Sequence, residues 1–207
     1  MTERECDHYD EYDDLKRRRV IWAFLGLIGV AAFAVFLVWA ILHPHGPRFV
    51  LQDVTINEFN ITQPNYLTLN LQVTVSSRNP NDKIGIFYDR LDIYASYRYQ
   101  EVTIARLLPT TYQGHKEVTV WSPVLIGTAV PVAPYLSPSL NEDGIAGLVL
   151  LNIKIDGRVR WKVGSWVSGG YRLHVNCPAF ISYPRQLVGG AGPAMKYQLV
   201  QRCAVDV

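Results

Sequence analysis

Histidine, cysteine and paired carboxylates are the side chains here that could catalyse a reaction or bind a metal, and their spacing argues against both. His174 and Cys177 are three residues apart in a stretch of alternating apolar and polar residues, which places them on opposite faces of a strand. Glu142 and Asp143 lie in a region rich in Pro, Gly and Asn, where such carboxylates cap turns. The sequence has no G-x-S-x-G, H-E-x-x-H, phosphate-binding loop or C-x-x-C motif. We therefore predict that the protein is not an enzyme and uses no metal or cofactor.

One short motif predicts a covalent modification. Asn60-Ile61-Thr62 is an N-x-[ST] sequon with a permitted middle residue, a motif that is used in chains entering the secretory path. We predict that Asn60 is glycosylated. The alternative is a sequon that stays unused.

Two of the three cysteines fall in the C-terminal part of the chain. Cys177 and Cys203 each share the parity of the apolar residues in an alternating stretch, so both face the interior of a sheet. If the two strands are neighbours, these cysteines form a disulfide. The alternative is a pair of free, buried thiols.

Four basic residues share one face of the longest alternating stretch, residues 149–163. The apolar residues there have odd numbers, and the polar set includes Lys154, Arg158, Arg160 and Lys162. The simpler interpretation of this basic stripe is a solvated face that carries Asp156 as a partner, with the Lys and Arg residues protecting the sheet from aggregation. The alternative is a site for an anionic surface, either a phospholipid headgroup or an acidic cell-wall polysaccharide. The basic stripe is the candidate ligand site of this part of the chain.

Residues 20–42 must place all of these groups relative to a membrane. They contain no charged residue, His, Asn or Gln, and as a helix they are roughly 34 Å long, against a hydrocarbon core of about 30 Å. A cleaved signal peptide is the alternative, but its apolar region is shorter and ends in small residues. We predict an uncleaved signal-anchor helix.

The flanking charges predict the orientation of this span. Lys16, Arg17, Arg18 and Arg19 precede it directly, whereas the first six residues after it hold a single Arg. By the positive-inside rule, the N-terminus stays in the cytosol and residues 49–207 lie in the lumen or outside the cell. The same basic cluster is suited to anionic lipid headgroups of the inner leaflet.

Beyond residue 48 the hydrophobic period is two, which is typical of half-buried strands. Residues 67–75 alternate without exception, and residues 149–163 do so with a bend expected at Gly157. Parity shifts after Tyr99, which suggests a bulge or bend near Gln100. A short helix is plausible only over residues 135–141. About seven or eight strands joined by turns predict an all-β, antiparallel β-sandwich.

The predicted domain organisation is therefore simple. Residues 1–19 form a short, disordered cytosolic tail, 20–42 the transmembrane helix, 43–48 a Pro/Gly stalk, and 49–207 the outer domain. The net charge of +2 gives no reason to expect nucleic acid as a partner. The oligomeric state stays open, a homo-oligomer included.

Several short motifs occur together in an order that is specific for one plant family. The chain resembles the harpin-induced-like proteins, relatives of the non-race-specific disease-resistance protein, which carry a late embryogenesis abundant group-2 domain. The motifs are Arg78-Asn79-Pro80-Asn81, Ile86-Phe87-Tyr88-Asp89, Tyr112-Gln113-Gly114, the run from Gly157 to Gly164, and Cys177-Pro178. The tail departs from the longer, Pro-rich tail of many members.

The resemblance implies a function as well as a fold. It implies an immunoglobulin-like or fibronectin-III-like sandwich on a single-pass plasma-membrane protein, acting without catalysis in pathogen-triggered defence, the hypersensitive response and stress. Its partners would be proteins of defence signalling, membrane lipids and cell-wall components. Internal secretory membranes and plasmodesmata are the alternative locations. A membrane-anchored tether for lipid or wall polysaccharide, acting through the basic stripe, is the alternative function.

Overall fold

The computed structural model describes residues 3–41, 45–62, 65–182 and 195–207. The chain forms two compact units, Met1–His43 and Pro44–Val207, which we describe separately. The second unit begins within residues 43–48, so most of the predicted stalk is counted with the folded domain.

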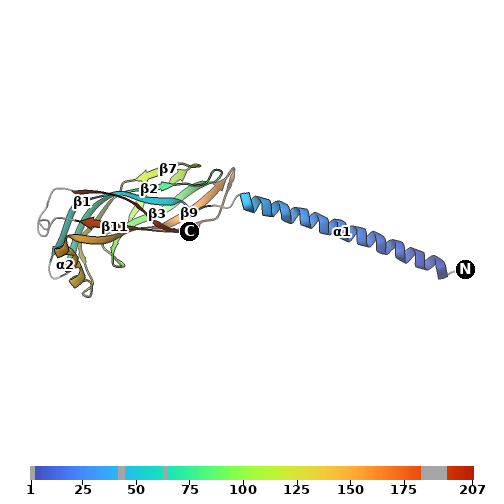
Figure 1. Ribbon diagram of the computed structural model, residues 1–207, viewed down its shortest axis with the longest axis horizontal. Helices are drawn as coiled ribbons and strands as arrows, with labels where there is room; N and C mark the ends of the chain where they lie inside the picture. Colours follow the sequence, from blue (N-terminus) through green and yellow to red (C-terminus); the bar gives the residue numbers. More distant parts are fainter. Residues whose placement is uncertain (1–2, 42–44, 63–64, 183–194) are drawn as a thin grey trace. The chain divides into compact units, whose positions relative to one another are not determined.

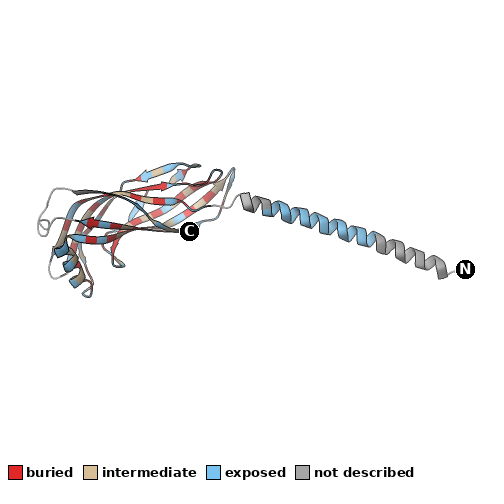
Figure 2. Ribbon diagram, viewed as in Figure 1, coloured by how far each residue is buried: buried red, intermediate tan, exposed pale blue. Residues whose placement is uncertain are grey.

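The first unit is one helix, α1, Glu3–Ile41 (Figure 1). Its segment Lys16–Phe36 is long and apolar enough to cross a membrane, and it is fully exposed in the structure (Figure 2). The helix begins at Glu3, whereas the sequence predicts a disordered tail up to residue 19. No Gly or Pro precedes Gly26, so nothing in the sequence interrupts a helix that the apolar span propagates toward the N-terminus.

The second unit consists of two antiparallel sheets. Sheet A has the order β12-β1-β2-β7, with β8 also paired to β2, and sheet B has the order β13-β11-β9-β3-β4, with β5, β6 and β10 on its flanks. The strands of sheet A are β1 (Arg48–Thr62), β2 (Tyr66–Arg78), β7 (Val118–Trp121), β8 (Val124–Pro131) and β12 (Met195–Arg202). Those of sheet B are β3 (Gly85–Tyr97), β4 (Gln100–Glu101), β5 (Arg106–Leu108), β6 (Thr111–Gln113), β9 (Leu148–Val163), β10 (Trp166–Val167), β11 (Tyr171–Ser182) and β13 (Ala204–Asp206).

One apolar core lies between the sheets (Figure 2). On β2 every odd residue from Leu67 to Val75 is fully buried, as the alternation predicts. On β9 the odd residues from Val149 to Ile155 are buried in the same way. The all-β, antiparallel sandwich predicted from the sequence is confirmed, and its immunoglobulin-like detail stays a prediction.

The parity shift near Gln100 has a different cause from the one predicted. β3 ends at Tyr97, and Arg98 and Tyr99 form a tight turn with φ angles of 42° and 74° before β4 begins. Two central residues with positive φ suit the right-handed twist of a hairpin. The shift therefore reflects a hairpin rather than a bulge.

The predicted short helix is displaced toward the C-terminus. α2 spans Ser137–Ala146 and ends at Gly147, whose φ of 72° is the left-handed conformation that stops a helix. The hydroxyl of Tyr97 donates to the Asp143 carboxylate over 2.7 Å, which ties α2 to β3. Burial, and then this carboxylate, raise the pKa of Tyr97.

Candidate functional site

The basic stripe lies on the outer face of β9, as the alternation predicts. Val159 is fully buried and Trp161 nearly so, while Arg158, Arg160 and Lys162 point away from the core. Lys154 lies on the same outer face of β9, four residues before Arg158. β9 is flanked by β3 and β11, so the surroundings of the stripe come from segments distant in sequence.

Arg160 is engaged within the domain. Its Nε and one terminal nitrogen donate to the two carboxylate oxygens of Asp89 over 2.7 and 2.6 Å, a bidentate pair. These bonds raise the pKa of Arg160 further, so its charge is permanent. Asp89 is the extra residue of a β-bulge, because the register of β3 against β9 shifts between Tyr88 and Arg90. The bulge aims a carboxylate at the middle of the stripe.

Aromatic rings accompany the two lysines of the stripe. The ammonium of Lys162 lies 5.1 Å from the ring centre of Tyr112 and 5.7 Å from that of Phe87, and Lys154 lies 5.9 Å from that of Tyr99. Such cation–π contacts hold an ammonium while leaving it hydrated. The stripe is thus a partly satisfied face rather than a row of free cations.

Arg158 has a different environment, set across the strands. It stands opposite Arg90 of β3 on one side and Arg172 of β11 on the other, and all three side chains are exposed. Arg90 pairs with Asp92 over 2.8 Å, whereas Arg158 has no ion pair among the described residues. Periodicity along one strand does not reveal such a row, because only the register between strands brings it together.

The next row toward the far end of the sheet is acidic. Asp156 accepts from the Tyr94 hydroxyl over 2.7 Å and lies 2.6 Å from Nδ1 of His174. Burial, and then Asp156, raise the pKa of Tyr94. Asp156 therefore partners neighbouring strands instead of a cation of the stripe. Within the described part of the chain, no group of three His, Cys, Asp or Glu is placed to hold a metal ion. A hollow of about 770 Å³ opens beside this row, lined in part by Lys154, Tyr99 and Phe180.

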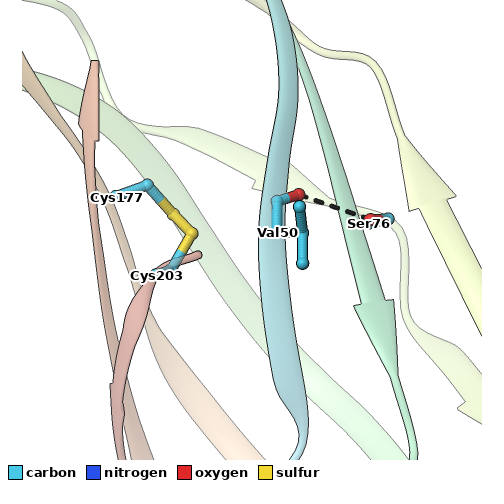
Figure 3. The surroundings of a disulfide bond; sticks show 4 residues. All are labelled: Val50, Ser76, Cys177 and Cys203. Atoms are coloured by element: carbon cyan, nitrogen blue, oxygen red, sulfur yellow. Dashed lines mark hydrogen bonds between the residues drawn. A yellow bond between two sulfur atoms is a disulfide. The ribbon is translucent and has the colours of Figure 1, made fainter. Parts of the chain in front are cut away.

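The cysteines Cys177 and Cys203 are bonded to each other in the structure (Figure 3). Cys203 lies between β12 of sheet A and β13 of sheet B, at the point where the chain crosses from one sheet to the other. Cys177 is fully buried on β11. Their sequence separation is 26 residues, and a loop of that length contributes roughly 3–4 kcal/mol in the chain-entropy model. The bond fixes the C-terminal strands to sheet B.

The remaining predicted sites lie on single elements. Asn60 is on β1, half-buried, with its side chain on the side opposite the buried Phe59. The residues of the basic cluster 16–19 are exposed on α1.

Residues from three of the five motifs that carry the resemblance lie in a buried polar network. Asn79 donates to the carbonyls of Ile84 and Gly114 over 2.7 and 2.9 Å. The Tyr88 hydroxyl lies 2.8 Å from that of Ser77 and donates to Gln113 over 2.9 Å. Their role is to satisfy backbone and side-chain groups in the core, so these three motifs mark architecture rather than chemistry.

Comparison with known proteins identifies the family. Residues 74–178 match the family described as Late embryogenesis abundant protein. NDR1/HIN1-like protein 1 of Arabidopsis thaliana is 47% identical over 99% of this chain and 100% of its own length. The chain belongs to the NDR1/HIN1-like family. NDR1/HIN1-like protein 12 of the same plant is 46% identical over 100% of both chains, and protein 26 is 38% identical over 81% of this chain and 80% of its own.

One of the solved structures that the chain matches is also a late embryogenesis abundant protein. The solution structure of a putative late embryogenesis abundant protein matches 80% of this chain and 88% of its own, with 15% identity and a TM-score of 0.35. The NDR1/HIN1-like relatives thus link this chain to a plant family related to defence, and its apolar helix α1 is consistent with a membrane anchor.

Proposed function

We propose that this chain is a single-pass plasma-membrane protein that acts, without catalysis, as an interaction and signalling component in plant defence and stress. The observation that carries the proposal is the 47% identity with NDR1/HIN1-like protein 1, which extends over nearly the whole chain and therefore includes helix and sandwich. The N-terminus is cytosolic, and the sandwich outside meets protein partners and cell-wall components.

The disulfide supports this orientation. Disulfides persist in oxidising compartments and are rare in the cytosol. Cys177 and Cys203 both belong to the sandwich, and their bond joins β11 of sheet B to the link between β12 and β13. The basic cluster at residues 16–19, on the other side of the apolar segment, agrees with a cytosolic N-terminus.

The first test is the gel mobility of the full chain, expressed in plant membranes, with and without N-glycosidase. We expect a mobility shift that disappears in Asn60→Gln, because the sequon is then lumenal. If no shift occurs, protease treatment of sealed vesicles decides: protection of the sandwich leaves the orientation intact, and its digestion from the cytosolic side overturns it.

Function is tested in leaves challenged with a pathogen. We expect ion leakage, a measure of the hypersensitive response, to change on expression of the full chain but not of a chain that lacks residues 1–43. The same leakage response from both chains would contradict a role that depends on membrane anchoring.

A second candidate function is a tether for acidic wall polysaccharide. The observation that favours it is Arg158, which is exposed, has no ion pair among the described residues, and lies on the same face of β9 as Lys162. Binding of the full chain to polygalacturonate should weaken with salt and fall in Arg158→Gln with Lys162→Gln. Arg160 is unsuited to this test, because its replacement would leave the Asp89 carboxylate without its ion-pair partner. Binding that is unchanged in the double variant removes the stripe from consideration.

A further inference from the structure

A second basic cluster lies on the outer face of sheet A, at the end where the chain enters the domain. Arg48 begins β1 and is directly opposite Arg78 of β2, and Arg202 of β12 is opposite Val50. Phe49, next to Arg48, and Ser77, next to Arg78, are buried, so these two arginines point outward. All three arginines are exposed. They line one hollow of about 580 Å³.

This arrangement has no evident structural benefit. Like charges directly opposite each other on adjacent strands are destabilising. None of the three arginines forms an ion pair with the part of the chain that the structure describes. The backbone next to Arg202 is moreover held in place. Cys203 is disulfide-bonded, and the N–H of Cys203 donates to the Phe49 carbonyl over 3.0 Å.

Exposed apolar side chains border the cluster. On β7, Val118 is opposite Arg78 and Val120 is opposite Ser76, and their exposed fractions are 53% and 51%. Val118 and Val120 share the outer face of β7, because Trp121, the next residue along the strand, is buried on the opposite face. Basic residues beside exposed apolar ones are the composition of surfaces that lie in a membrane interface. A site for a free anion alone would not need the valines.

The short covalent link limits how far this end of the sandwich can lie from the predicted span. Arg48 follows Leu42, the last residue of the predicted span, by six residues, which extend over at most roughly 20 Å. The length that is free to extend is smaller still, because Asn81 binds both the N–H and the carbonyl of His45. The His45 N–H donates to Oδ1 of Asn81 over 2.9 Å, and Nδ2 of Asn81 donates to the His45 carbonyl over 2.8 Å.

We propose that this arginine–valine patch docks on the phospholipid headgroups of the membrane in which α1 is anchored. The guanidinium groups bind headgroup phosphates, and the valines enter the boundary with the acyl chains. The patch is defined by Arg48, Arg78, Arg202, Val118 and Val120. This proposal needs the anchor but not a particular orientation, so it fails or stands separately from the proposed function.

The test uses the full chain in vesicles of phosphatidylcholine mixed with phosphatidylserine. In a Cys6→Ser background, a fluorophore on Val120→Cys reports contact through quenching by nitroxide-labelled lipid, with Val118→Cys as a second position. Leu107→Cys, exposed on the other sheet, is the matched label control. We expect strong quenching at residues 118 and 120 and little at 107. Equal quenching at all positions overturns the proposal.

Charge-matched variants test the role of the arginines. Arg48→Gln with Arg78→Gln should lower the ratio of docked to undocked molecules by about 30-fold, at about 1 kcal/mol per arginine near an anionic surface. Arg106→Gln with Arg172→Gln removes the same charge from sheet B and should leave quenching unchanged. An equal loss in both pairs overturns the patch. Inorganic phosphate, compared with chloride at equal ionic strength, should not displace the domain; displacement would identify the ligand as free phosphate.

Discussion

Several polar side chains of the sandwich are buried, and each is held by particular hydrogen-bond partners. Asn79, fully buried, donates to two carbonyls from different turns, and Gln113 donates to the Ser77 and Glu117 carbonyls over 2.7 and 3.1 Å. A buried amide without such partners would cost stability, so each of these side chains is fixed by the groups it satisfies. Burial likewise raises the pKa of Tyr88, whose hydroxyl stays protonated and donates to Gln113.

At this scale we predict the effect of Tyr88→Phe. The change removes the hydroxyl that joins Ser77 to Gln113, so the Ser77 hydroxyl and Oε1 of Gln113 both lose this buried partner. The free energy of unfolding should therefore fall by about 1–3 kcal/mol. Urea unfolding of the detergent-solubilised full chain, followed by near-UV circular dichroism, measures the change. Tyr171→Phe, at a tyrosine that is 49% exposed, should have an effect within about 0.5 kcal/mol. Equal effects in both variants would show that the network contributes nothing.

Among the elements, β9 organises sheet B, with β3 on one side and β11 on the other. Gly157, where the sequence predicts a bend, lies within the continuous strand β9, and the structure gives a specific reason for the glycine. A Cβ at this position would lie 2.0 Å from the carbonyl oxygen of Arg90, where β3 closes in after its bulge. Glycine is required because of this approach of two backbones. The same bulge places Asp89 against Arg160.

Gly157→Ala should therefore separate β3 from β9. We expect a loss of about 1–3 kcal/mol in the free energy of unfolding, since a backbone carbonyl cannot move aside as a side chain does. Thermal unfolding of the full chain in detergent measures it. Gly169→Ala is the control, because a Cβ there meets nothing within 4 Å. A stable Gly157→Ala variant would mean that the strands separate at no cost.

At the scale of the whole molecule, one apolar helix precedes one disulfide-linked sandwich. Orientation in the membrane then decides which compartment the sandwich meets. We predict that the basic cluster at residues 16–19 is the dominant orienting signal, since acidic residues contribute little to the positive-inside rule.

Replacing all four residues 16–19 with Gln should invert a large part of the chains. The measurement is the fraction of chains that carries a glycan at Asn60, which should fall, checked by loss of protease protection of the sandwich in sealed vesicles. Asp13→Asn with Asp14→Asn is the matched control and should leave the orientation unchanged. Full protection after loss of the basic cluster would show that another signal sets the orientation.

The sequence alone determined the classes of structure in this protein. Continuous apolarity over residues 20–42 and strict alternation over 67–75 and 149–163 each reflect one local period, and a local period is readable because the environment repeats along the chain. The motifs around Asn79 and Tyr88 likewise indicated the family, although not that these residues are partners in the core.

Only the tertiary structure decided which residues from different strands meet. Asp89 turned out to neutralise Arg160, Arg90 and Arg172 to flank Arg158, and Arg48, Arg78 and Arg202 to share one surface. These contacts depend on register and on a bulge, and shifting either by one residue would move every side chain to the opposite face. The physical reason is that pairing between strands is set by the packing of the whole core, which no segment encodes by itself.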